Sequence, residues 1–250
     1  MKIRNFHFQT KELTSQELLA YETGVHLGDG SLQIKNRVYR VIYSGDIRND
    51  YDFYSRKIPE IIKKLYKKTP LIYKRKSDNT IILILNSREV VESKVKLGLP
   101  VGNKRKLRNI PEWLNKEELI PHFIRGLADA DFCLSFKKNR RGINCEPRIE
   151  FFTNNKVLAK FVYNALIELK FKVAYENTMN RQYKEYRIRM YGNKMLKKWM
   201  KIIGFNNLKH ISKLMVFEKF GYCPIRLTTQ ERMMLLAPSS GGKLYYSLLL

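Results

Sequence analysis

The sequence predicts an α+β fold made of two αββαββα repeats, and three observations support this prediction. A short pattern occurs twice, at residues 24–30 and 126–132. The stretches that follow the two copies repeat the same order of strand-like and helix-like segments, which is the signature of an internal repeat. The chain of 250 residues is also long enough for two packed units of ordinary size. We therefore expect two pseudo-symmetric halves that form a saddle of antiparallel sheets, with the two motif helices packed at the centre.

The repeated pattern predicts close packing of two helices. In each copy two small residues lie four positions apart and an acid follows directly: Gly24, Gly28 and Asp29 in the first copy, and Gly126, Ala130 and Asp131 in the second. Residues four apart lie on the same face of a helix. Small residues at this spacing let two helix backbones approach closely. If the two helices pack on each other, Asp29 and Asp131 lie side by side at the base of the pair.

The first repeat is expected to begin with its motif helix, which Thr14 and Glu17 start as a capping box. Apolar residues at helical spacing mark the long helix that follows, and β-rich runs mark the strands. In chain order, the segments expected after Asp29 are two strands, a long helix and two more strands: residues 31–36, 38–44, 50–67, 71–76 and 80–86. A shorter helix that ends near Gly98 closes this repeat.

The second repeat follows the same order. Asn115 and Glu118 form another capping-box pattern ahead of the second motif helix. After Asp131 we expect two strands, a helix, two strands and a final helix: residues 133–138, 148–153, 156–169, 172–177, 186–191 and 195–203.

These elements divide the chain into five segments. They are an N-terminal extension, the first repeat, a basic linker, the second repeat and a C-terminal tail: residues 1–14, 15–98, 99–114, 115–222 and 223–250. Within the tail, residues 228–236 predict one more helix packed on the second half. The stretch that begins at Pro238 is rich in Ser and Gly, which is typical of a flexible segment.

The duplicated unit, with an acid closing each copy, resembles the monomeric LAGLIDADG homing endonucleases. Residues 126–131, GLADAD, are close to the motif that names this family, and residues 20–32 resemble its first-copy variant. The resemblance covers roughly residues 15–220. It implies the same saddle around DNA, cleavage of both strands across the minor groove, and 3′ overhangs. Leu27 stands at the first acid of the motif, as is usual in such first copies. Phe132 replaces the final glycine, so we expect the turn after Asp131 to be built differently.

The charge of the chain supports a polyanionic partner. Lys and Arg number 48 against 23 Asp and Glu, which gives a net charge of +25 and an isoelectric point near 9.9. A charge of this size repels itself in a compact chain unless a polyanion neutralises it. Nucleic acid is the expected partner, with a membrane surface and a plain solvated surface as alternatives. No run of about 18 apolar residues occurs, so no membrane span is expected.

The cysteines and histidines argue against other site chemistries. The three cysteines, Cys133, Cys145 and Cys223, are odd in number, and the four histidines show no paired ligand spacing. Unlinked thiols fit a reducing, intracellular location, which is the cytoplasm, the nucleoid or an organelle of the host. A zinc site is not expected, and we interpret His26 on the first motif helix as a packed residue.

The DNA-binding surface is predicted from the alternation of charge along the strands. Successive strand residues point to opposite faces, so Gln33 and Lys35 share a face while Ile34 lies on the other. Arg and Lys suit guanine edges in the major groove, and Gln and Asn suit adenine edges. The residues that we expect to contact DNA are Gln33, Lys35, Arg37, Arg40, Lys74, Arg75, Lys76, Ser135, Lys137, Lys138, Arg140, Arg148, Arg181, Arg187 and Arg189.

The paired acids predict a divalent-metal site. Two carboxylates held together are costly unless they share a proton or bind a metal. Asp29 and Asp131 offer the hard oxygen ligands that Mg²⁺ prefers, and we predict Gly28 and Ala130, which precede them, as further residues of the metal site. Mg²⁺ is the expected cofactor, with Mn²⁺ or Ca²⁺ able to substitute in binding. A metal that bridges the acids and a scissile phosphate can activate water and stabilise the leaving oxygen.

The family resemblance also implies a lysine near the scissile phosphate. Our candidates are Lys104 and Lys209, because each follows the last helix of its repeat after a glycine. A plain phosphate contact is the alternative role for both lysines.

The expected function is metal-dependent, site-specific cleavage of double-stranded DNA by a monomer that reads a long asymmetric target. Two alternatives use the same fold. One is a maturase that binds its own intron RNA and assists its folding. The other is a DNA-binding regulator without catalysis, although the presence of both Asp29 and Asp131 argues against a purely binding role.

Overall fold

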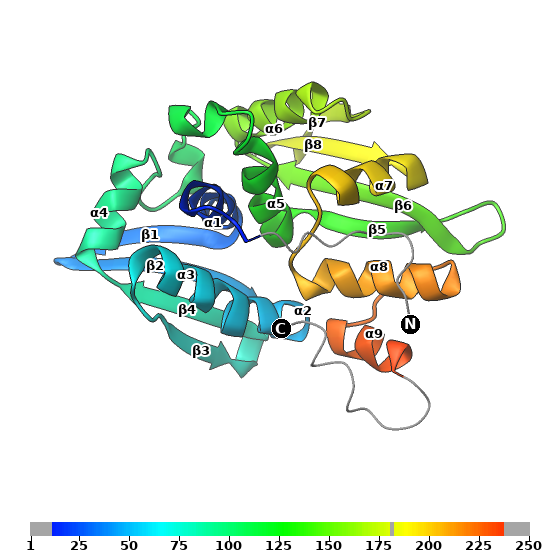
Figure 1. Ribbon diagram of the computed structural model, residues 1–250, viewed down its shortest axis with the longest axis horizontal. Helices are drawn as coiled ribbons and strands as arrows, with labels where there is room; N and C mark the ends of the chain where they lie inside the picture. Colours follow the sequence, from blue (N-terminus) through cyan, green and yellow to red (C-terminus); the bar gives the residue numbers. More distant parts are fainter. Residues whose placement is uncertain (1–11, 181–182, 238–250) are drawn as a thin grey trace.

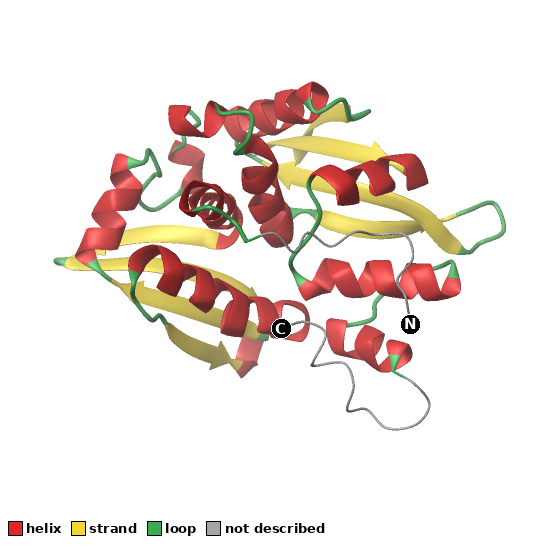
Figure 2. Ribbon diagram, in the orientation of Figure 1, coloured by secondary structure: helices red, strands yellow, loops and turns green. Residues whose placement is uncertain are grey.

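Two four-stranded antiparallel sheets, one from each half of the chain, lie on either side of a central pair of helices (Figure 1). The computed structural model describes residues 12–180 and 183–237. Arg181, residues 1–11 of the predicted N-terminal extension and residues 238–250 of the predicted tail lie outside the described residues. Helices and strands account for most of both halves, with short connections between them (Figure 2).

The first half contains the sheet that we call sheet A, with strand order β1-β2-β4-β3. Its elements are α1 (Ser15–Asp29), β1 (Gly30–Lys35), β2 (Val38–Asp46), α2 (Ile47–Asp52), a π-helical turn (Phe53–Lys57), α3 (Ile58–Tyr66), β3 (Leu71–Arg75), β4 (Thr80–Asn86) and α4 (Arg88–Lys96). The long helix expected over residues 50–67 is thus one helical run that starts earlier. It starts earlier because the side chain of Asp46 caps it by accepting from the backbone N–H of Arg48.

The second half contains sheet B, with the equivalent strand order β5-β6-β8-β7. Its elements are α5 (Ile120–Asp131), β5 (Cys133–Lys138), β6 (Asn144–Thr153), α6 (Lys156–Glu168), β7 (Ala174–Asn180), β8 (Tyr183–Tyr191), α7 (Gly192–Ile202), α8 (Leu208–Phe220) and α9 (Thr229–Leu236). The αββαββα order predicted for both repeats is confirmed, and strands β6 and β8 begin a few residues earlier than expected.

The start of the second motif helix differs from the prediction. The capping box at Thr14 and Glu17 forms as expected, but Asn115 ends a separate 3-10 turn, and α5 begins at Ile120 without a side-chain cap. Pro121 occupies the first turn of α5, where its missing N–H has no helical partner to lose. The proline therefore sets the helix start, and the predicted second capping box is wrong.

Helices α1 and α5 pack with their backbones in direct contact. A Cβ atom added to Gly24 would collide with the carbonyl oxygen of Phe123, and one added to Gly126 would collide with that of Tyr21. Apolar neighbours such as Leu127, which is fully buried, fill the sides of the pair. The small residues at four-residue spacing thus let the two helix backbones meet, as the sequence predicted.

Two helices, α8 and α9, follow α7 and join the halves. Helix α9 packs on α8, as expected for the tail, and also contacts α2 of the first half (Figure 1). At this contact Thr229 Oγ1 donates to the carbonyl oxygen of Asn49 over 3.1 Å. Within the described ranges, no helix is long and apolar enough to cross a membrane.

Candidate active site

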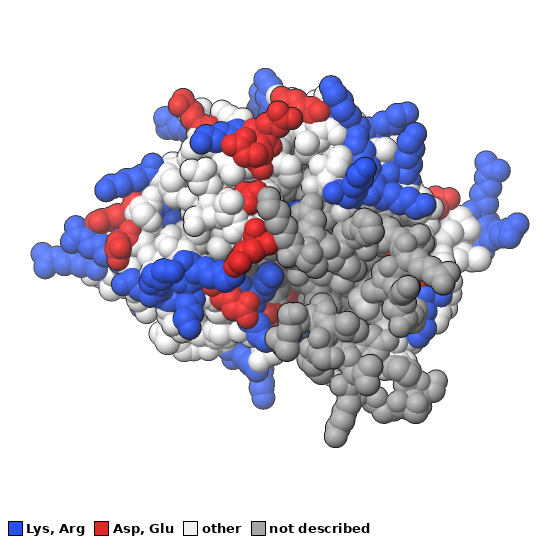
Figure 3. Space-filling model, viewed as in Figure 1, with Lys and Arg blue, Asp and Glu red and all other residues white. Residues whose placement is uncertain are grey.

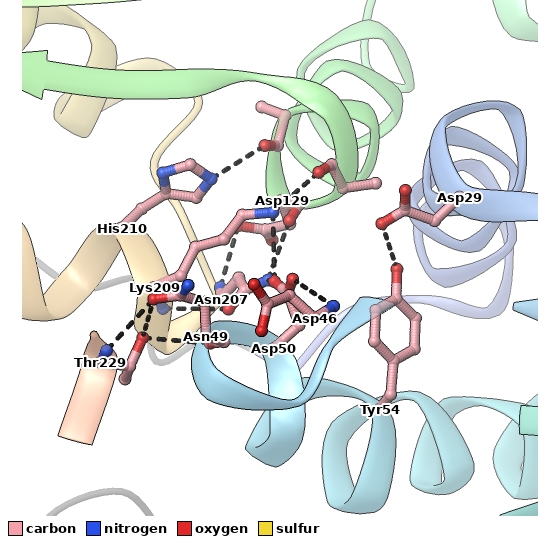
Figure 4. Close-up of polar contacts among 12 residues, drawn as sticks. Asp29, Asp46, Asn49, Asp50, Tyr54, Asp129, Asn207, Lys209, His210 and Thr229 are labelled. Atoms are coloured by element: carbon pink, nitrogen blue, oxygen red, sulfur yellow. Dashed lines mark hydrogen bonds and ion pairs between the residues drawn. The ribbon is translucent and has the colours of Figure 1, made fainter. Parts of the chain in front are cut away.

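The two predicted acids lie next to each other where the central helices end. Asp29 is the last residue of α1 and Asp131 the last of α5. A Cβ atom added to Gly28 would lie 3.5 Å from Cγ of Asp131, so the end of α1 touches the second carboxylate. Tyr54, from the helical run after β2, donates its hydroxyl to Oδ2 of Asp29 over 2.5 Å (Figure 4). The repeat therefore brings both acids into one site, as expected.

The environment of the acids disfavours two negative charges. Loss of hydration and repulsion from Asp131 raise the pKa of Asp29 from 3.8 to about 7. The attraction of Lys209 and the hydrogen bond from Tyr54 act in the opposite direction. Loss of hydration also raises the pKa of Asp131, against the attraction of Lys104 and Lys209. The pair is thus held in a place where a cation or a shared proton stabilises it.

The raised pKa of Asp29 predicts a pH dependence of stability in the metal-free protein. Between about pH 4 and pH 7 the folded state keeps a proton that the unfolded state has released, so stability falls as pH rises through this window. Asp29→Asn removes the charge and should raise the melting temperature at pH 8 by roughly 2–4 °C, about 1 kcal/mol for a chain of this size. The gain should vanish near pH 4. Scanning calorimetry in EDTA measures this, and an equal gain at both pH values would contradict it.

Both candidate lysines reach the site in equivalent positions. Lys104 Nζ donates to the carbonyl oxygen of Gly28, and Lys209 Nζ donates to that of Ala130 over 2.8 Å. Lys104 thus contacts the residue before Asp29, and Lys209 contacts the residue before Asp131. Figure 4 shows Lys209 reaching past the end of α5 toward this region.

Sequence reasoning missed a polar network that holds the second lysine. Asp50, on α2 of the first half, lies 3.1 Å from Lys209 Nζ and accepts a 2.8 Å hydrogen bond from the side-chain amide of Asn207 (Figure 4). The backbone N–H of Asn207 donates to Asp129, which also accepts from the hydroxyl of Tyr21 over 2.7 Å. The contacts of Asp50 and Tyr21 cross between the halves, and Asn207 and Asp129 lie far apart in the chain, so no local pattern in the sequence could reveal this network.

The turns after the two acids have the same backbone form, so the predicted difference between them is wrong. Gly30 has φ −87° and ψ 162°, and Phe132 has φ −79° and ψ 156°, which is extended backbone that any residue adopts. Gly30 is required for space, because a Cβ there would lie 2.6 Å from Nδ1 of His26. The second copy has Ala128 at the position of His26, which leaves room for Phe132 to stack on Phe151. His26 itself is 1% exposed, which confirms it as a packed residue.

The predicted DNA contacts of sheet A divide between two faces. Gln33, Lys35 and Arg40 are exposed on the outer face, which is the face turned away from the buried core. Lys74 lies on the other face, with Nζ 4.3 Å from the ring centre of Tyr51 on α2. The remaining predicted contacts of this half are also exposed. Arg37 lies in the β1–β2 turn, Arg75 at the end of β3 and Lys76 in the turn after β3. Ile34 is 43% exposed, contrary to the expectation that it packs, because β1 extends beyond the core after Leu32.

Sheet B presents its predicted contacts on one outer face. The antiparallel register places Ser135 opposite Arg148 and Lys137 one step further along the same face. Arg187 and Arg189 lie on the same side of β8, while Ile188 between them is fully buried. Two further predicted residues, Lys138 and Arg140, are exposed where β5 ends and its hairpin begins.

Positive charge is spread over both halves of the molecule. In the face shown in Figure 3, Lys and Arg side chains project from the helices that cover both sheets and from the far tip of the β5–β6 hairpin. Acidic side chains on this face are fewer. This distribution matches the net charge of +25 and provides a long-range attraction for a polyanion.

The residues at the acid pair fit a hard divalent cation. The two carboxylates repel each other. The carbonyl oxygens of Gly28 and Ala130 each accept a hydrogen bond from a lysine ammonium group, so they are already placed against positive charge. The acid pair supplies only two side-chain ligands, because no group of three or more His, Cys, Asp and Glu side chains that could hold a metal ion occurs among residues 12–180 and 183–237. Water and phosphate oxygens would therefore complete the coordination, which is usual for Mg²⁺.

Comparison with known proteins identifies the fold. No protein-family model matches the sequence, and no curated protein matches it either. Among solved structures, the homing endonuclease I-DmoI in complex with DNA and Mn is similar, with 18% identity, a TM-score of 0.55 and coverage of 76% of this chain and 98% of that one. The I-LtrWI LAGLIDADG homing endonuclease bound to target DNA has 13% identity, a TM-score of 0.52 and coverage of 83% and 91%. The N-terminal LAGLIDADG domain of WhiA has 15% identity, a TM-score of 0.52 and coverage of 78% and 87%.

Proposed function

We propose that this chain, which has the LAGLIDADG homing endonuclease fold, is a site-specific endonuclease that hydrolyses both strands of an asymmetric DNA target with Mg²⁺. The observation that carries the proposal is the pair of carboxylates at the ends of α1 and α5, with a lysine beside each. A regulator that only binds DNA has no need of two repelling acids side by side at the helix ends. The similar structures, which include DNA complexes with Mn and Ca, support the proposal.

The residues of the site divide the work between binding and positioning. Asp29 and Asp131 would hold the cation, which supplies charge stabilisation at the scissile phosphate. Lys104 and Lys209 are placed to neutralise phosphate oxygens or to orient the attacking water. Tyr54 keeps Asp29 in position through its hydrogen bond. One carboxylate and one lysine are then available for each DNA strand.

If DNA is the partner, the binding constant should fall steeply as the salt concentration rises. Each phosphate neutralised on duplex DNA contributes about 0.9 to the slope of log K against log salt concentration. With a net charge of +25 and basic residues on both sheets, we expect a slope of several units in magnitude. Fluorescence anisotropy with a labelled duplex between about 50 and 300 mM salt measures this slope. A slope near zero would mean that the positive charge serves another partner.

Mapping of DNA ends tests the proposed function. The protein is incubated with genomic DNA of its source organism and with the gene's insertion site joined without the insert, in Mg²⁺ and in EDTA, and the new ends are sequenced. We expect breaks at one recurrent sequence, with 3′ overhangs, in Mg²⁺ only. Specific binding at a site without breaks would favour a regulator, and selective binding of the intron RNA without DNA breaks would favour a maturase.

A further inference from the structure

We propose that the two sheets read chemically different half-sites, with sheet A packed against thymine methyl groups and sheet B reading G·C pairs through fixed arginines and glutamates. This inference rests on the proposed function and specifies its DNA substrate. It follows from a contrast between the outer faces of two sheets that share the same strand order.

The middle of the outer face of sheet A is apolar. The side chains that form this apolar patch, identified by strand register, are Ile42, Leu71, Tyr73, Ile82 and Ile84. Leu71 is 51% exposed and Tyr73 is 50% exposed, so the patch is open to solvent or to a partner. Polar groups lie beside it toward the β1 edge, where Arg40 Nε donates to Oδ1 of Asn86 over 3.2 Å.

An apolar patch in the major groove favours A·T pairs. The C5-methyl group of thymine is the apolar feature that a base pair presents there, whereas G·C pairs present only donors and acceptors. Covering these polar groups with Ile42, Ile82 and Ile84 would leave them without hydrogen bonds, which is unfavourable. Sheet A therefore distinguishes A·T from G·C pairs by packing against thymine methyl groups, and the basic residues around the patch supply phosphate contacts.

The outer face of sheet B carries a cluster of charged side chains between two exposed rings, Phe152 and Tyr191, whose centres lie 5.5 Å from the guanidinium of Arg187 and 5.0 Å from that of Arg148. Glu150, near its centre, is 6% exposed and lies 3.1 Å from Arg189 Nε and 3.5 Å from an Arg148 guanidinium nitrogen. A second carboxylate, Glu176 on β7, lies 2.7 Å from the other side of Arg189. Arg189 is thus held between two carboxylates from neighbouring strands.

Carboxylates on this face identify how sheet B would meet DNA. Carboxylates near phosphates would be repelled, so this face is suited to base edges. Glu176, whose side chain is 46% exposed, can accept from cytosine N4, while the buried Glu150 orients the arginines. Arg189 and Arg148, whose directions these ion pairs fix, suit O6 and N7 of guanine. Because each arginine is already oriented, less side-chain entropy is lost on binding. Sheet B therefore reads G·C pairs by hydrogen bonding.

Selection of bound sequences from a random duplex library, with the full chain in EDTA so that no site is cut, tests the proposal. One half of the selected site should be rich in A·T and the other in G·C, and a site with the same base preferences in both halves would overturn the inference. Glu150→Gln should relax base choice only in the G·C half, and Ile84→Thr only in the A·T half. Glu60→Gln, on the exposed side of α3 and outside both outer sheet faces, is the matched control for Glu150→Gln and should change neither half.

Replacement of thymine by deoxyuridine in the selected duplex isolates the methyl contacts. Removing one buried methyl group should weaken binding by roughly threefold for each contacted thymine in the A·T half, and by nothing in the other half. Equal affinity for the thymine and deoxyuridine duplexes would contradict the packing role of the patch. A protein that selects and cuts a site without these differences refutes this inference alone, whereas one that neither selects nor cuts DNA refutes the proposed function.

Discussion

Replacing either acid, as Asp29→Asn or Asp131→Asn, is expected to lower double-strand cleavage by on the order of 10³-fold, the scale of losing one charged group at a reacting centre. The physical reason is the loss of a cation ligand at the junction of α1 and α5, where two carboxylates face one site. DNA affinity should stay within about threefold, because the predicted DNA contacts lie on the sheets. Gel assays of cleavage and binding on the mapped target measure both quantities.

Asp52→Asn is the matched control for these substitutions. Asp52 is also an acid of the first half, but its carboxylate pairs with Arg56 one helical turn later, at the surface. Its cleavage rate should stay near that of the wild type. The opposite result would contradict the metal site. In that case Asp131→Asn would lose DNA affinity by orders of magnitude but still cut bound DNA at the normal rate.

Gly126→Ala is expected to destabilise the protein by about 3 kcal/mol or more, at the upper end of the cost of overpacking a core. The added Cβ would collide with the backbone carbonyl of Tyr21, and a backbone group cannot rotate away as a side chain can. The two helices must then separate, which also moves Asp29 from Asp131. A melting temperature lower by roughly 6–12 °C is the measurable result for a chain of this size.

Lys160→Ala is the control for this change, because Lys160 is exposed on α6 and its replacement adds no atoms. It should shift the melting temperature by about 1 °C or less, within the range of ordinary surface substitutions. Gly24→Ala should behave like Gly126→Ala, since its Cβ would meet the carbonyl of Phe123. An unchanged melting temperature for Gly126→Ala would mean that the helices are not in backbone contact.

The features that the sequence predicted well are those with a local cause. Each motif helix has two small residues four positions apart, beginning at Gly24 and at Gly126, and this spacing predicts close packing of the two helices. The acids that follow could therefore be placed together. Lys104 and Lys209 were found because each follows its repeat's last helix by a similar distance. Both reach the carbonyl group of the residue that precedes an acid.

The features that the sequence did not reveal depend on contacts between the halves. Asp50 and Asn207 meet across the interface, 2.8 Å apart, and hold Lys209 in place. Nothing in the residues around Asp50 marks it as different from other acids at a helix start. The turn at Phe132 was misjudged for a similar reason, because the need for glycine in the first copy comes from the closeness of His26 and not from the φ angle of Gly30.

Charge alternation predicted one sheet better than the other. In sheet B, arginines alternate with a buried isoleucine along β8, as the pattern indicated. In sheet A, strand β4 is apolar at five successive positions, from Ile81 to Leu85, so both faces carry apolar residues and alternation cannot assign them. Only the strand register shows that Ile82 and Ile84 lie on the outer face.

The central claim is that one chain holds both halves of a double-strand cleavage site. Single-turnover cleavage at one protein per duplex, with each strand labelled separately, tests this most directly, together with sedimentation of the free protein. We expect a monomer that cuts both strands of an asymmetric target at this ratio, with similar rates for the two strands because the turns after Asp29 and Asp131 have the same form. Cleavage that requires two chains per duplex, or a palindromic target, would contradict the claim.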